Sequence, residues 1–122
     1  MIDLTIAVAD GATVYVPIPC RCTLAKMVAV FQSSDVAAND TIKAYRDSTE
    51  VNAVTAVTEA GLVPEVGVPD STHGQLIFDP ESATAANQVI KLISGSENGS
   101  AAAIVTLSLD ESAYVKQAAS EA

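Results

Sequence analysis

Residues 2–9, Ile-Asp-Leu-Thr-Ile-Ala-Val-Ala, decide the fold class of this chain. Large aliphatic side chains stand at every second position and alternate with smaller or polar ones. Because successive side chains of a β-strand point to opposite faces, this period of two predicts a strand with one buried and one exposed face. Asp10-Gly11 follows with the residues of a tight turn, so a second strand is expected directly after it.

The same pattern recurs along the chain. Strand-like runs bounded by turn residues lie at residues 13–18, 23–31, 41–46, 75–79, 89–93 and 102–109. With short strands also expected between residues 47 and 72, the count is seven or eight, and no helices alternate with them. This pattern predicts an all-β protein, a single-domain β-sandwich. Pro17 and Pro19 lack backbone donors, so the end of the second strand is expected to lie at a sheet edge or to leave the sheet.

Residues 23–31, Thr-Leu-Ala-Lys-Met-Val-Ala-Val-Phe, fit two periodicities. The spacing of Leu24, Met27 and Phe31 is compatible with one face of a helix, but the run also fits a strand buried on both sides. The β-branched and aromatic residues favour the strand, and Ser33-Ser34-Asp35 would end a helix early. We therefore expect a strand with two apolar faces.

Residues 1–110 are expected to form the single sandwich domain, because 122 residues are enough for one substantial core. The stretch 47–72, broken by glycines and prolines in its second half, predicts short strands and a long loop. Residues 94–100 predict a hairpin with a long tip. Residues 111–122 are polar and rich in alanine, and we expect them to form a C-terminal tail outside the sandwich.

Composition excludes several classes of function. The formal net charge is −9, and the six basic residues form no cluster, so nucleic acid is not an expected partner. No apolar run approaches the length of a membrane span and no basic leader opens the chain, which predicts a product made in the cytoplasm. An acidic surface favours a basic partner surface. Only 4% of residues are aromatic although 49% are hydrophobic, which predicts a core of aliphatic side chains.

No group of residues predicts a catalytic, cofactor or metal site. The single histidine, His73, shares one loop with Asp70 and Ser71, and neighbours in one loop rarely form the geometry of a catalytic triad. Cys20 and Cys22 lack a second pair of ligands at zinc spacing, and their separation is poor for a disulfide, so we expect free thiols. The carboxylates are scattered singly, without the acidic loop of a calcium site. We expect a protein that is not an enzyme and that holds no cofactor.

The run from Ala12 to Lys26, ATVYVPIPCRCTLAK, resembles the first third of the capsid decoration (cement) proteins of tailed bacteriophages. Those proteins have a VYVPVP strand, a short polar turn, and a TITK strand that enters a VxAVL run. Residues 27–31, MVAVF, stand in that last place here. Residues 40–45, 82–87 and 103–109 are similar to later strands and turns of the group, whereas residues 50–68 depart from it.

The resemblance implies a jelly-roll-like sandwich that binds the major capsid protein of a phage on the outside of the assembled shell and stabilises it. Such a protein is made in the host cytoplasm and ends on the surface of the virion. A homo-oligomer, dimer or trimer, is expected to cover the second apolar face of residues 23–31. Two alternatives stay open: a phage receptor- or glycan-binding fibre-head module that uses residues 61–74 or 94–100, and a small enzyme.

Overall fold

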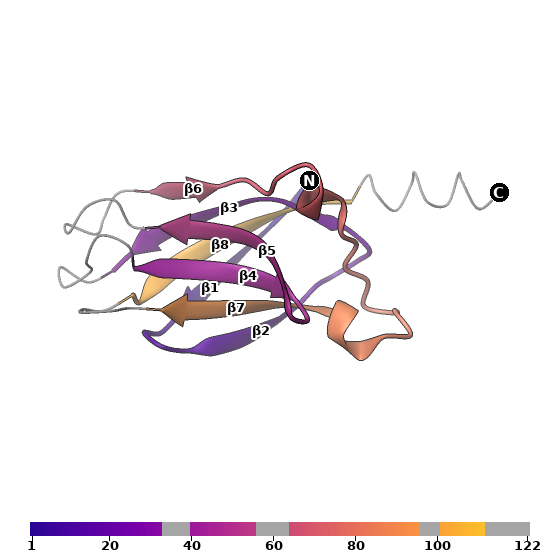
Figure 1. Cartoon of the computed structure of the whole chain (residues 1–122), viewed down its shortest axis with the longest axis horizontal. Coiled ribbons are helices and arrows are strands. Elements are labelled where there is room, and N and C mark those ends of the chain that lie inside the picture. The colour runs from indigo at the N-terminus through magenta and orange to yellow at the C-terminus, as the bar shows by residue number, and fades with distance from the viewer. Residues whose placement is uncertain (33–39, 56–63, 96–100, 112–122) are drawn as a thin grey trace.

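The protein is a sandwich of two antiparallel sheets in the computed structural model, which describes residues 1–32, 40–55, 64–95 and 101–111 (Figure 1). Sheet A has the strand order β1-β8-β3-β6, and sheet B has the order β2-β7-β4-β5. The strands are β1 (Ile2–Val8), β2 (Thr13–Pro17), β3 (Thr23–Phe31), β4 (Thr41–Arg46), β5 (Thr49–Thr55), β6 (Glu65–Gly67), β7 (Val89–Gly95) and β8 (Ala103–Asp110). The all-β sandwich predicted from the sequence is confirmed.

The strands pair in the wrap of a jelly roll. β1 pairs with β8, β2 with β7, β3 with β6 and β4 with β5, so the chain runs like one long hairpin folded back on itself. Alternate pairs fall in opposite sheets, and the pairings of β3 with β8 and of β4 with β7 complete each sheet. This is the double Greek key of eight-stranded jelly rolls. β2, which ends at Pro17, lies at an edge of sheet B, as expected.

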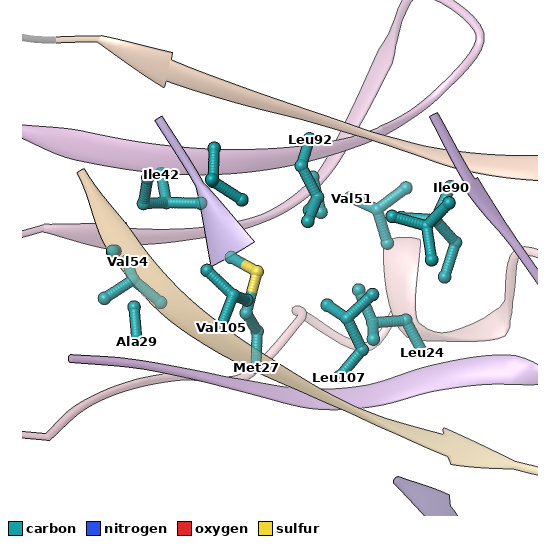
Figure 2. Packing of buried hydrophobic residues seen from close by; sticks show 14 of the residues in the cluster. Leu24, Met27, Ala29, Ile42, Val51, Val54, Ile90, Leu92, Val105 and Leu107 are labelled. Atoms are coloured by element: carbon teal, nitrogen blue, oxygen red, sulfur yellow. The ribbon is translucent and has the colours of Figure 1, made fainter. Parts of the chain in front are cut away.

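The core lies between the two sheets and is mostly aliphatic (Figure 2). Leu24, Met27, Val105 and Leu107 come from sheet A, and they share the core with buried residues of sheet B. The residues from sheet B include Ile42, Val51, Val54, Ile90 and Leu92. Fully burying one such side chain contributes about 1.5–3 kcal/mol, so this layer is the main source of stability.

The two periodicities of residues 23–31 have a structural cause. The segment is strand β3, and its register against β8 shifts between Leu24 and Lys26. The shift leaves Ala25 as an extra residue, so Leu24 and Met27 are both buried although they stand three positions apart. The strand prediction is confirmed, and the helix-like spacing marks the bulge.

The stretch 47–72 contributes β5 and β6, which confirms the expected short strands. Residues 75–79, expected to form a strand, do not: Phe78 makes a single β-bridge with Cys22. The prediction was wrong because this segment belongs to the long connection between β6 and β7, where two 3-10 turns, η1 (His73–Gln75) and η2 (Ala85–Asn87), also lie. Most of the expected hairpin tip (residues 96–100) lies outside the described residues, and so does the expected tail from residue 112 to 122.

β5 and β6 join the two sheets along one side of the sandwich. The buried Asn52 of β5 donates from Nδ2 to the carbonyl oxygen of Gly67 at 2.8 Å, and its Oδ1 accepts from the backbone N–H of Ala53 at 2.9 Å. A Cβ on Gly67 would lie 2.4 Å from the carbonyl oxygen of Ala53. Gly67 is therefore required for this close approach of two backbones.

We expect Gly67→Ala to lower the free energy of unfolding by about 1–3 kcal/mol, because β6 must move away from β5 and stretch the bond from Asn52. Denaturant unfolding followed by circular dichroism measures the loss. Gly74→Ala is the control, since its Cβ would make only an ordinary contact, 3.6 Å from Pro69 Cβ. Equal stability of the two variants would contradict the close approach.

Candidate functional site

The three residues that superficially form a triad make a local turn. The backbone N–H of His73 donates to Asp70 Oδ1 at 2.7 Å, and His73 Nδ1 lies 2.8 Å from Asp70 Oδ2. The backbone bond first, and the imidazole second, hold the pKa of Asp70 below its usual range. Ser71, in the same exposed loop, makes no hydrogen bond with His73 in the described part of the chain. The carboxylate therefore caps the turn that opens η1 and does not align a nucleophile.

Cys20 and Cys22 are free thiols with different surroundings. Cys22 is fully buried, and its backbone N–H donates to the carbonyl oxygen of Phe78 at 2.9 Å. Burial, together with the negative charge of Cys20 and of nearby carboxylates, raises the pKa of Cys22 to about 12. Cys22 is therefore a packing residue and not a nucleophile. Cys20 is half-buried.

The raised pKa of Cys22 predicts that the protein loses stability at high pH. Below about pH 9 the thiol is protonated in the folded and unfolded chains alike. Between about pH 9 and 12 the unfolded chain releases this proton and the folded chain keeps it. The free energy of unfolding should then fall as pH rises, by at most about 1.4 kcal/mol per pH unit for one proton.

Cys22→Ala should remove this part of the pH dependence, whereas Cys20→Ala should keep it. Denaturant unfolding at a series of pH values between 8 and 12 measures both. The two substitutions should leave binding to a partner unchanged. Identical pH profiles for the wild type and Cys22→Ala would contradict the assignment.

A small cleft of about 330 Å³ lies beside the cysteines. It is lined by Pro19, Cys20, Arg21, Asp79, Pro80 and Glu81. Among the residues that the structure describes, Arg21 Nε has no hydrogen-bond partner, and it stands 3.9 Å from Asp79 Oδ2. The ionisable groups of this lining are one cation, two carboxylates and the free thiol of Cys20. Within residues 1–32, 40–55, 64–95 and 101–111, no three His, Cys, Asp or Glu residues lie close enough together to hold a metal ion.

The outer face of sheet B carries aromatic and basic side chains. The register places Tyr15, Lys91, Tyr45 and Glu50 side by side on four adjacent strands. Tyr15 is 64% exposed. Lys91 Nζ stands 5.4 Å from the ring centroid of Tyr45, within the range of a cation–π contact. We call these four residues the tyrosine row.

Lys43 adds a second cation to the same face, and its Nζ lies 3.4 Å from Glu50 Oε1. This face thus holds two of the three tyrosines and two of the six basic residues of a chain with a net charge of −9. Tyrosine is enriched at protein-binding surfaces, whereas lysine and glutamate are not, so the exposed ring of Tyr15 is what marks this face. The tyrosine row is the candidate site for a partner.

The sequence analysis did not identify this row, because its members come from strands that are distant in sequence. The alternation of Val14 and Val16 with Tyr15 in the expected strand 13–18 is a signal that could have placed Tyr15 on the face opposite the valines. Lys91 and Tyr45 join it only through the order β2-β7-β4 and its register. That order was not part of the sequence prediction.

Comparison with known proteins gives no relative: no family model, no curated protein and no solved structure matches this chain. No helix in the described segments is long and apolar enough to cross a membrane. The candidate site therefore stands on its own geometry.

Proposed function

We propose that this protein binds the outer surface of a phage capsid, through the major capsid protein, and stabilises the shell. The observation that carries the proposal is the tyrosine row on the outer face of sheet B. Tyr15 is exposed on a strand, and a tyrosine has only two side-chain torsions to fix on binding. Tyrosine is also enriched among the residues that dominate protein interfaces. The resemblance of residues 12–31 to decoration proteins supports the same role.

The chain has the properties that a capsid-stabilising protein needs. A cement protein has to fold by itself, stay soluble, and make modest contacts that are repeated over many copies. Net charge keeps it soluble, and repetition on a symmetric shell makes weak contacts effectively permanent. A jelly roll with rigid outer faces meets these needs without an active site.

Mixing the purified protein with bare capsids of the phage that encodes it tests the proposal. We expect binding that saturates and that adds symmetric density to the shell in electron micrographs. Binding should weaken with added salt, because a strongly acidic chain meets a shell surface of complementary charge through its rim. Capsids of an unrelated phage are the control.

A protein that ignores bare capsids would overturn the proposal. If the same protein bound cells in a glycan-dependent manner, the fibre-head alternative would replace it. Residues 64–74 and 94–95 are the described parts of the loops that this alternative would use.

A further inference from the structure

The outer face of sheet A differs from that of sheet B, because its centre is uncharged. Three rows of residues on the side away from the core cross β1, β8 and β3 in register: Asp3–Ser108–Lys26, Thr5–Thr106–Val28 and Ala7–Ile104–Val30. Ser108 is itself buried, whereas Asp3 and Lys26 on either side of it are exposed. Ile104 is 38% exposed, and Val66 of β6, which pairs with Val28, is 61% exposed. Exposed apolar side chains that lie close together on a sheet face are candidates for an interaction surface.

The two charges of these rows lie on opposite sides of β8. Asp3 stands on β1 and Lys26 on β3, and Ser108 of β8 lies between them. Two strand spacings, ~10 Å, separate their backbones. Both side chains are exposed, and neither takes part in an ion pair within the described residues.

We infer that this face is the contact between two copies of the chain, related by a two-fold axis that runs along β8. Rotation by 180° about this axis stacks the outer faces of sheet A of the two copies on each other. β1 of one copy then lies over β3 of the other, and β8 lies over β8. Asp3 of each copy then lies opposite Lys26 of the other, and the ion pair forms twice. The inference rests on the charges of this face and not on the proposed function.

A two-fold axis across the strands would give a different result. It would set the row of Asp3 and Lys26 against the row of Ala7, Ile104 and Val30, and so press two charges onto apolar side chains. The position of the charges therefore selects the axis along β8.

The uncharged residues fit the same arrangement. Thr106 and Ile104 lie on β8 and would meet their own counterparts at the axis. Stacked sheets cross at about 30°, which separates the strand ends. This crossing keeps Asp110, at the end of β8, away from its counterpart.

A charge-swap cycle tests the inference by analytical ultracentrifugation over a wide range of protein concentration. We expect a concentration-dependent dimer for the wild type. Lys26→Asp and Asp3→Lys, made singly, each set two like-charged pairs across the interface and should raise the dimer Kd about tenfold or more. The double variant, Asp3→Lys with Lys26→Asp, should restore the wild-type Kd. Circular dichroism verifies that each variant is folded.

Ile104→Asp provides a second variant, which should abolish the dimer because two carboxylates would meet at the axis. Thr13→Asp, on the exposed edge strand of sheet B, is its matched control and should leave the dimer intact. A wild type that is monomeric at every concentration would overturn the inference. So would a double variant that associates as weakly as the single ones. Neither result bears on the capsid test, which depends on the tyrosine row.

Discussion

Phe78→Ala should lower the free energy of unfolding by about 3–5 kcal/mol. The ring of Phe78 is fully buried, and its backbone N–H donates to the carbonyl oxygen of Cys22 at 2.8 Å. This residue anchors the long connection between β6 and β7 to the segment that leads into β3. Only five aromatic residues are present in the chain, so few large side chains are available to fill the cavity.

Denaturant unfolding measures this loss, which is about a fifth or more of the 5–15 kcal/mol that is typical of a domain. Phe78→Leu is the matched control and should cost less than about 1.5 kcal/mol if the core repacks around it. An unchanged unfolding midpoint for Phe78→Ala would contradict the burial of the ring.

Tyr15→Ala should weaken binding to capsids about 30-fold or more, which corresponds to the loss of about 2 kcal/mol that defines a dominant interface residue. The exposed ring makes few contacts inside the protein, so the free energy of unfolding should change by less than about 0.5 kcal/mol. The two alanine variants thus separate the two roles of an aromatic residue: Phe78 for folding and Tyr15 for binding.

Titration of bare capsids with the wild type and with Tyr15→Ala measures the change in affinity. Tyr15→Phe keeps the ring and should retain most of the binding. Thr13→Ala, on the same strand and face, is a control for general effects on the edge strand. Unaltered binding by Tyr15→Ala would remove the tyrosine row from the interface while leaving the fold unaffected.

The alternation of side chains was enough to predict the sandwich and most strands. For residues 2–8 the burial pattern can be predicted from the sequence, because every second side chain is large and aliphatic and these are the less exposed ones. Residues 23–31 were ambiguous because the bulge at Ala25 changes the phase of the alternation. The prediction of a strand at residues 75–79 was wrong because Leu76 and Phe78 alternate as in a strand, although the segment forms only one β-bridge in the described structure.

The candidate site was beyond sequence reasoning for a different reason. A surface across a sheet depends on which strands are neighbours and on their register, and both are set by long-range pairing. The place of Asp3 opposite Lys26 in a two-copy arrangement likewise depends on β8 lying between β1 and β3. The expectation that nucleic acid is not a partner, in contrast, depended on the sequence alone, because the basic residues form no cluster along it.

The jelly-roll wrap also determines when the protein can fold. Ile2 pairs with Leu109, and β7 and β8, which follow the other six strands of the described residues in sequence, occupy interior positions in their sheets. Before they leave the ribosome, only the pairs β3–β6 and β4–β5 are available. Closing such long loops is slow, so the sandwich should form only after β8 has been synthesised and should take milliseconds to seconds. A chain truncated before β7 would have no smaller sandwich to adopt, so only chains that include both β7 and β8 would reach the folded state.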